Sequence, residues 1–218
     1  MKNEQPMIDL LGETVLAEPA PLGLGAAIQG GGAKVNRRPN DFYPTPADVT
    51  RALLRVEGEC LRNVAPGPVW EPCGRGGAIL AELIADGFAT VGTDLVPDPA
   101  HGVAAQDLLQ VRCALARKVV TNPPFALAAE MIAHLLEQLQ VDYLALLLKA
   151  TFWHADERRA LFRRHRPARI HALTWRPDFL GKGAPTMDCA WVVWQRGSAG
   201  TIYNVLPRHA ECQGSLNL

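Results

Sequence analysis

The stretch Val119-Val120-Thr121-Asn122-Pro123-Pro124-Phe125 joins a short apolar run to a rigid, polar turn. The apolar run predicts a buried strand, and the two prolines prevent a helix from starting directly after it. The tip of this strand therefore carries a side-chain amide, a backbone carbonyl and a flat ring. Together these groups can hold an amino group that is attached to a planar ring. This placement favours a functional site over a structural turn.

A second motif lies upstream, where the short apolar strand at Val69-Trp70 runs into Glu71-Pro72-Cys73-Gly74-Arg75-Gly76-Gly77. A helix is predicted after it at 78–84, and the next strand, at 89–93, has Asp94 at its tip. Repeated strand–helix units of this kind predict a doubly wound α/β fold. We expect a mostly parallel, seven-stranded sheet with helices on both faces. The late apolar runs at 170–173 and 190–194 are expected to form an antiparallel pair at one edge.

The chain divides by composition into three parts. Residues 1–40 are rich in Gly and Pro and poor in periodic apolar residues, which predicts a flexible N-terminal arm. Residues 41–200 carry the alternating pattern and form the predicted domain, and residues 201–218 are expected to be a C-terminal tail. Within the domain, Thr45-Pro46 is expected to begin a helix with Thr45 as its cap.

Bulk composition limits the classes of function. The 218 residues are 48% hydrophobic, 20% charged and carry a formal net charge of +0, so no global field attracts nucleic acid. No apolar run is long enough to span a membrane, and the N-terminus does not read as a secretory signal. The five cysteines are scattered without a CxxC pair, which argues against a metal site or a disulfide framework. We therefore expect reduced thiols, no metal and a cytoplasmic protein.

Three motifs fall at predicted strand ends, where ligands bind in open α/β sheets. The glycine turn at 74–77 lets a backbone approach a ligand closely. Asp94 follows it by about 20 residues, the spacing at which an acid binds ribose hydroxyls. Asn122 stands at the third strand end. A nucleoside-containing cofactor between the glycine turn and Asn122 is the simplest arrangement.

These motifs resemble those of S-adenosylmethionine-dependent DNA adenine-N6 methyltransferases of the small type found in phages and prophages. The likeness covers about residues 41–197. It rests on Asp41-Phe42-Tyr43-Pro44-Thr45-Pro46, Trp70-Glu71-Pro72-Cys73-Gly74-Arg75-Gly76, Asp107-Leu108-Leu109, Asn122-Pro123-Pro124-Phe125 and Ala190-Trp191-Val192-Val193-Trp194-Gln195-Arg196-Gly197. The resemblance implies a Rossmann-like class I methyltransferase fold, S-adenosyl-L-methionine as cofactor and DNA as partner, with the target base flipped out of the helix.

The resemblance also implies residue roles. Asn122, Pro123, Pro124 and Phe125 match the acceptor site at which methyl transfer takes place. The positions that match cofactor-binding ones are Tyr43, Thr45, Pro46, Glu71, Cys73, Gly74, Gly76, Asp94 and Asp107, together with Asn122. Arg75 departs from the family pattern, and both a solvated side chain and a phosphate contact stay open for it.

Cations gather in the last third of the chain, which favours contact with nucleic acid there. The expected nucleic-acid-binding residues are Arg158, Arg159, Arg163, Arg164, Arg166, Arg169, Arg176 and Lys182. The competing interpretation is a solvated basic helix balanced by Asp156 and Glu157. Sequence specificity is expected to come from loops such as 177–188 or to be relaxed.

Two alternatives stay open at this point. Asn-Pro-Pro-aromatic sites also occur in methyltransferases that act on RNA bases or on a protein glutamine amide. A non-catalytic nucleic-acid-binding relic of the fold is the other alternative. The target sequence and the oligomeric state are not readable from the sequence.

Overall fold

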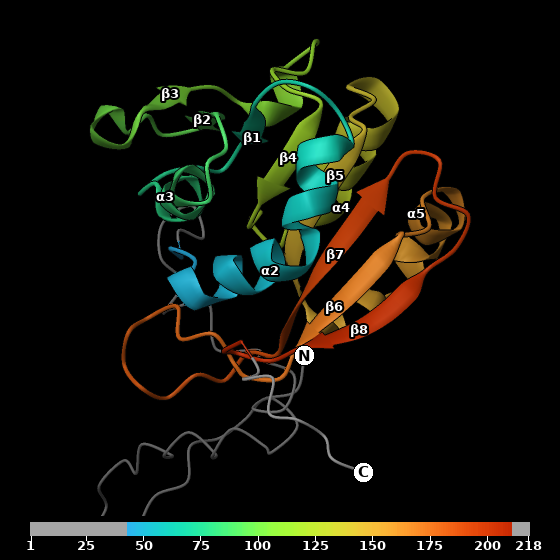
Figure 1. The fold of residues 1–218 in the computed structure, drawn as a ribbon. Coiled ribbons are helices and arrows are strands. Elements are labelled where there is room, and N and C mark those ends of the chain that lie inside the picture. The colour runs from blue at the N-terminus through green and yellow to red at the C-terminus, as the bar shows by residue number, and fades with distance from the viewer. Residues whose placement is uncertain (1–42, 211–218) are drawn as a thin grey trace, which may run out of the picture. The chain divides into compact units, whose positions relative to one another are not determined.

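The computed structural model describes residues 43–210, and these form an α/β fold around one eight-stranded sheet (Figure 1). The strand order is β3-β2-β1-β4-β5-β7-β6-β8. The predicted N-terminal arm at 1–40 lies outside the described residues. So do residues 211–218 of the predicted tail.

The strands β1 to β5 are all parallel to one another, whereas β7 runs antiparallel to both β5 and β6. The outermost strand, β8, is parallel to β6. The strand bounds are β1 Val69–Glu71, β2 Thr90–Asp94, β3 Val103–Ala105, β4 Lys118–Thr121, β5 Tyr143–Lys149, β6 Arg169–Leu173, β7 Cys189–Gln195 and β8 Ile202–Leu206.

The connections between the strands carry α-helices and short helical turns. The α-helices are α2 Ala47–Asn63, α3 Ala78–Ala85, α4 Ala128–Ala133 and α5 Arg159–Arg164. The helical turns are η3 Pro99–His101, η4 Leu108–Gln110, η5 His134–Gln138, η6 Ala150–Trp153 and η7 Asp156–Arg158. None of the helices within residues 43–210 is long and apolar enough to cross a membrane.

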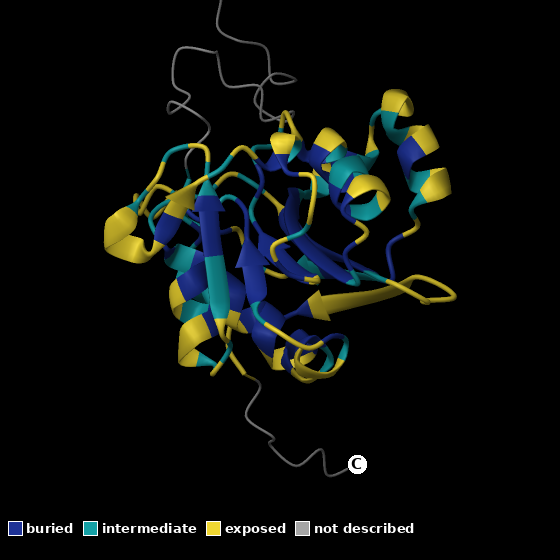
Figure 2. Ribbon diagram, turned by 90° about the horizontal axis from the view of Figure 1, so that it is seen from above, coloured by how far each residue is buried: buried dark blue, intermediate teal, exposed yellow. Residues whose placement is uncertain are grey.

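The central strand β5 shows why helices cover both faces of the sheet. Its side chains alternate, so Leu144, Leu146 and Leu148 pack into one apolar cluster with α4. Tyr143, Ala145 and Leu147 pack into a second cluster with α2 and α3 on the opposite face. A strand that is buried on both sides needs an unbroken apolar run, as β5 has. In Figure 2 the middle strands are dark blue, whereas β8 is almost entirely yellow.

The order of the strands reverses next to β1. The chain proceeds from β1 to β2 and β3 on one side, and then returns to place β4 and β5 on the other. In a doubly wound sheet this reversal leaves a crevice at the carboxyl ends of the two strands that flank it. The crevice here lies beyond β1, which ends at Glu71, and β4, which ends at Thr121.

The predicted fold class is confirmed, but the sheet has eight strands and not seven. The additional strand β8 comes from the stretch that was expected to be a tail, so the sheet continues past residue 200. Its large apolar side chains Ile202, Tyr203 and Val205 are exposed. An edge strand exposed on both faces lacks the burial pattern by which strands are recognised. As a consequence, the antiparallel pair β6–β7 lies one strand in from the edge.

Several helices also differ from expectation. Thr45 does not cap α2, since Pro46 is the capping residue and no side chain caps that end. The apolar residues over 127–139 are spaced as in one α-helix, but α4 passes into a π-helical turn at η5. The basic residues over 154–165 do not form one helix, because they lie in the short turn η7 and in the six-residue α5 that follows it.

Candidate functional site

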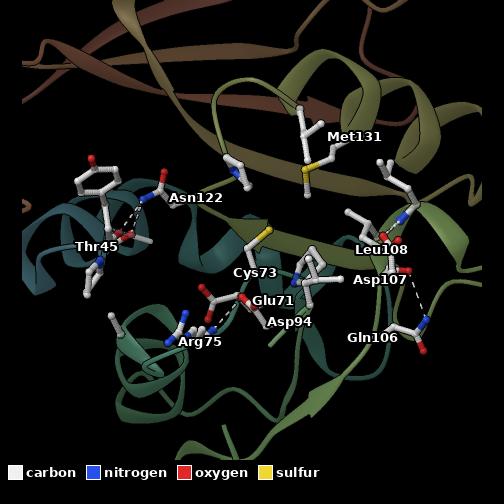
Figure 3. Close-up of a pocket in the computed structure, with 18 of the residues that line it drawn as sticks. Thr45, Glu71, Cys73, Arg75, Asp94, Gln106, Asp107, Leu108, Asn122 and Met131 are labelled. Carbon is white, nitrogen blue, oxygen red and sulfur yellow. Dashed lines mark hydrogen bonds between the residues drawn. The ribbon is translucent and has the colours of Figure 1, made fainter. Parts of the chain in front are cut away.

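A cavity of about 430 Å³ opens at the carboxyl ends of β1, β2 and β4 (Figure 3). We call it the large cavity. Its volume is in the range of sites that hold small molecules and cofactors. Its lining residues come from these strand ends, from the segments that follow β3 and precede α2, and from α3 and α4: Tyr43, Pro44, Thr45, Glu71, Pro72, Cys73, Arg75, Ala78, Asp94, Leu95, Gln106, Asp107, Leu108, Leu109, Asn122, Pro124, Ala126, Leu127 and Met131.

The glycine turn forms one side of the large cavity through residues next to its glycines. Cys73 and Arg75 line the cavity, whereas Gly74 and Gly76 do not. The Gly74 amide donates to the Thr93 carbonyl at 2.8 Å, and a side chain there would press on the Glu71 carbonyl at 3.3 Å. Gly76 takes a positive φ of 78°, which glycine adopts without strain. The glycines therefore shape the turn, and their predicted role in cofactor binding would be indirect.

Glu71 is buried at the end of β1 and holds the start of α3. Its Oε2 accepts a hydrogen bond from the Leu80 amide at 3.1 Å, within the first turn of that helix. Burial raises the pKa of this carboxyl well above its usual range, and the nearby Asp94 carboxylate raises it further. Glu71 also lines the large cavity, so a carboxyl with a raised pKa faces the ligand space.

Cys73 places a thiol on the same side (Figure 3). Burial raises the pKa of this thiol to about 12. A thiol that stays protonated near neutral pH is a poor nucleophile, because the thiolate is the reactive form. The arrangement does not support covalent catalysis through Cys73.

Two carboxylates lie at separate points on the lining of the large cavity. Asp94 accepts the Arg75 amide at 3.2 Å and the Val96 amide at 2.9 Å, one with each carboxylate oxygen. Asp107 is exposed, and its Oδ1 accepts the Leu109 amide at 3.0 Å. Each carboxylate keeps lone pairs for a further donor, because a carboxylate has about four acceptor sites. The backbone thus fixes two acceptors that face one space.

Asn122 closes the other end of the large cavity, and its amide is held in one orientation. Its Nδ2 donates to the Tyr43 carbonyl at 3.3 Å and to the Thr45 hydroxyl at 3.1 Å. A carbonyl can only accept, so the nitrogen must face Tyr43 and the oxygen Oδ1 must face away. Figure 3 shows this oxygen pointing away from Thr45. The segment before α2 therefore orients the amide, and Thr45 does so in place of capping the helix.

A second, smaller cavity of about 250 Å³ shares Tyr43 and Asn122 with the large one. We call it the small cavity. Pro123 and Phe125 supply its remaining strand-end residues, and the loop after β6 supplies the rest: Pro177, Asp178, Phe179, Leu180, Lys182, Ala184, Pro185, Thr186 and Met187. Its lining is mainly apolar and includes two aromatic rings besides Tyr43. Asn122 thus stands in the wall between two adjoining spaces.

Asp178 organises the loop that encloses the small cavity. Its carboxylate accepts the backbone amides of Leu180 at 3.3 Å, Lys182 at 3.2 Å and Gly183 at 2.6 Å. These hydrogen bonds, that from Gly183 first, lower the pKa of Asp178 below its usual value. One side chain therefore holds three backbone amides of the same loop in place.

The predicted basic residues fall into two groups. Arg164 pairs with Glu137, Arg176 pairs with Asp188, and Arg158 bonds the Phe152 carbonyl and covers the Phe152 ring. Arg169 lies in a buried cluster with Glu57 and His171 and is not available for a surface contact. The exposed members of the set that form no ion pair in the described part of the chain are Arg159, Arg163, Arg166 and Lys182.

Among residues 43–210 no group of His, Cys, Asp or Glu side chains has the arrangement of a metal site. The histidines serve other contacts: His171 is buried against Glu57, and His101 pairs with Asp98 on the surface.

The structure brings most of the predicted site residues together and adds others. Tyr43, Thr45, Glu71, Cys73, Asp94, Asp107 and Asn122 all line the large cavity, whereas Pro46 does not. The residues that sequence reasoning missed include Leu95, Gln106 and Met131 in this lining. Leu95 and Gln106 follow directly after β2 and β3, so their positions at strand ends were the available signal. Arg75 also lines the cavity.

No protein-family model matches the sequence, and no curated protein matches it. Solved structures do resemble it. A proposed RNA methyltransferase from Pyrococcus horikoshii aligns with a TM-score of 0.54 at 14% identity, over 78% of this chain and 96% of that one. The modification subunit of a proposed type I restriction enzyme from Vibrio vulnificus aligns with a TM-score of 0.52 at 13% identity, over 75% of this chain.

This chain spans only 47% of the length of the Vibrio subunit. A third match is a proposed class I S-adenosylmethionine-dependent methyltransferase from Listeria monocytogenes, with a TM-score of 0.52 and 12% identity, over 82% of this chain and 70% of that one. At these identities the likeness concerns the fold alone. The fold of residues 43–210 is the Rossmann-like fold of class I methyltransferases.

Proposed function

We propose that this protein transfers a methyl group from S-adenosyl-L-methionine to the N6 amino group of adenine in DNA. The observation that carries the proposal is the position of Asn122, whose oriented amide stands between two adjoining cavities. The large cavity would hold the methyl donor, and the small cavity would hold the base that accepts the methyl group.

The large cavity suits a nucleoside that carries an amino-acid tail. Asp94 would accept from the ribose hydroxyls and Asp107 from the adenine amino group, while Leu95, Leu108 and Met131 offer apolar contact. Tyr43 and Thr45 lie at the opposite end, where the methionine part would be held. When bound, S-adenosylmethionine supplies an electrophilic methyl group on a sulfonium.

The small cavity suits a planar base with an exocyclic amine. Its volume of about 250 Å³ is below the range of about 300–1,000 Å³ that is typical of drug-sized ligands. A single base is smaller than such ligands and suits a cavity of this size. The Asn122 Oδ1 and the Pro123 carbonyl can accept the two amine protons and so aim the nitrogen lone pair. Phe125 can stack on the base, which contributes about 1–3 kcal/mol.

Positioning accounts for most of the expected rate enhancement. Alignment of two reactants lowers a barrier by about 7–11 kcal/mol, whereas one net hydrogen bond contributes about 0.5–1.5 kcal/mol. The thiol of Cys73 offers no covalent route, because its pKa of about 12 keeps it protonated. The role of the chain is to orient the amine, to exclude water with the loop at 177–187 and to keep the two spaces adjacent.

DNA is the proposed acceptor because of the cations near the site and because of the family resemblance. A base must leave the duplex to reach the small cavity, at a cost of a few kcal/mol that phosphate contacts offset. Lys182 lies on the loop that lines the small cavity, and Arg159, Arg163 and Arg166 lie exposed on and after α5. Restriction–modification subunits share the fold, which agrees with this acceptor.

The test is a transfer assay with cofactor labelled with tritium in the methyl group. DNA, RNA and a mixture of unfolded proteins are offered separately, and digested nucleosides are separated by chromatography. The proposal predicts label in N6-methyladenine from DNA, and none with an Asn122→Ala variant. Label in RNA alone or in glutamine alone would reassign the acceptor, and cofactor binding without any transfer would favour a non-catalytic relic.

A further inference from the structure

A hollow of about 680 Å³ beside α5 is surrounded by three exposed arginines. Its lining residues are Trp153, Ala155, Asp156, Arg159, Phe162, Arg163 and Arg166. The neighbouring arginines Arg158 and Arg164 are held by contacts within the protein, but these three form no ion pair in the described part of the chain. Asp156 is the one acid in the lining, so positive charge remains in excess.

The backbone concentrates this charge. Arg159 and Arg163 are four residues apart on α5, so their side chains lie on one face of the helix, and Arg166 follows just after the helix ends. Like charges at this spacing destabilise a helix slightly. A surface anion that satisfies all three would remove that repulsion.

Aromatic rings accompany the arginines. The ring centroids of Trp153 and Phe162 are 4.6 Å apart, and the ring planes are tilted by 44°. Phe162 also contacts Phe152 edge-on at 5.8 Å, which anchors this pair to the protein core. Trp153 is only half-buried, so part of its indole faces the hollow. Cations beside an aromatic face are the combination that grips a single strand through its phosphates and bases.

The hollow lies against α5, which also lines a third cavity that adjoins the candidate acceptor site and carries two acids, Glu130 and Glu157. Phe125 lines the small cavity and also a third cavity, whose other wall is made by Arg158, Leu161 and Arg164 around α5. Lys149, the last residue of β5, has its Nζ 4.6 Å from the centre of the Phe125 ring. Trp153 follows it in the next turn, η6. A strand that leaves the small cavity past Phe125 would meet Lys149 and then α5.

We propose that this hollow is a second nucleic-acid site, which holds an unpaired nucleotide next to the target base. The arginines bind its phosphates, and Trp153 stacks on its base. The inference rests on the proposed function, in which the Asn122 site acts on DNA, and deepens it by naming the surface that holds the strand beside the target base.

Binding of a fluorescent single-stranded DNA oligonucleotide, followed by anisotropy at several salt concentrations without cofactor, tests the site. Each of Arg159→Ala, Arg163→Ala and Arg166→Ala should reduce the slope of log K against log salt by about 0.7, the value for one phosphate contact on a single strand. Trp153→Leu should weaken binding by about fivefold or more and leave the slope unchanged, because stacking involves no counterions.

Arg196→Ala is the matched control. It removes one exposed positive charge outside the lining of the hollow, just after β7, where Arg196 pairs with Asp142. Its salt slope should equal that of the unmodified protein. Slopes that are the same in the α5 variants and in the control would overturn the site. Binding of an acidic peptide is measured in the same way. If the Trp153 and arginine variants weakened peptide binding as much as oligonucleotide binding, the site would also be overturned.

The two proposals fail in distinguishable ways. All measurements are repeated with Asn122→Ala, which should transfer no methyl group but should keep the dependence of the salt slope on the three arginines, because Asn122 carries no charge. Methyl transfer to adenine together with unchanged salt slopes would refute the hollow and leave the proposed function standing. Arginine-dependent slopes in a protein that methylates no nucleic acid would refute the proposed function and leave the binding surface standing.

Discussion

The large and small cavities share Asn122 but are built in different ways. The large cavity is lined mostly by residues at or next to the ends of β1, β2, β3 and β4. The small cavity takes most of its lining from the loop at 177–187, and one carboxylate, Asp178, holds much of that loop. The sheet therefore fixes one space, whereas the other depends on a few local hydrogen bonds. A substitution that alters only one of the two cavities should therefore affect either donor binding or acceptor binding, but not both.

The largest effect is expected at the shared wall. Asn122→Ala removes the oriented amide and should lower turnover by about 100-fold or more, the cost of misplacing a reacting group. Cofactor affinity, measured by calorimetric titration, should stay nearly unchanged. Asn122→Asp is the informative companion, because a carboxylate cannot donate to the Tyr43 carbonyl and should lose the orientation as well. Near-normal turnover in Asn122→Ala would refute the assignment of the acceptor site.

A large effect on cofactor binding is expected in the large cavity. Asp94→Ala should weaken cofactor binding by about 10- to 150-fold, since hydrogen bonds to charged groups contribute about 1.5–3 kcal/mol. Affinity for oligonucleotide should not change. Asp94 also accepts the Arg75 and Val96 amides, so a thermal melt must show that the variant is folded. Unaltered cofactor affinity in a folded variant would contradict the role of Asp94.

An intermediate effect is expected at the loop. Asp178→Ala should raise KM for the nucleic acid several-fold and leave cofactor affinity unchanged, because it releases the Lys182 and Gly183 amides. Thr186→Ala, in the same loop, is the control. An equal rise in KM for the cofactor would show that the loop belongs to the large cavity as well.

The same carboxylate predicts a pH dependence. The pKa of Asp178 is lowered in the folded protein, so its stabilisation of the loop is present above the ordinary aspartate pKa. It is lost as the pH falls through the lowered value. Hydrogen exchange at the Lys182 and Gly183 amides, corrected for the intrinsic rate, should therefore lose protection in acid. Protection that does not vary with pH would contradict this role.

The smallest effect is expected at Glu71, behind the large cavity. Its pKa is raised by burial, so its contribution to stability is present below the ordinary glutamate pKa and is lost as the pH rises through the raised value. Glu71→Gln keeps an acceptor for the Leu80 amide and removes the charge. The Tm difference between the variant and the unmodified protein should therefore grow in favour of the variant as the pH rises. A constant difference would show that Glu71 does not titrate in this way.

The contrast between the cavities also explains what could be predicted from the sequence. Glu71, Asp94 and Asn122 follow apolar strands, and the carboxyl ends of parallel strands meet at one edge of a sheet. Their convergence on the large cavity follows from the chain pattern alone. Apolar periodicity likewise predicts β5, which is buried on both faces.

Other features depend on contacts between distant segments, which local patterns do not report. Thr45 precedes a helix and so predicts a cap, yet its hydroxyl accepts from Asn122, 77 positions away in the sequence. The strand β8 is exposed and lacks a buried face, so it was predicted as a tail. Which arginines form ion pairs also depends on the fold. Arg164 pairs with Glu137 and Arg176 with Asp188, and folding brings these partners together.

A crystal structure with S-adenosylhomocysteine and a short DNA bearing an unpaired adenine would test the central claim most directly. The account predicts that the product nucleoside lies in the large cavity with its ribose at Asp94, and that the adenine lies in the small cavity with its amino group at the Asn122 Oδ1. A ligand bound outside the large cavity, or an adenine that does not reach Asn122, would contradict it.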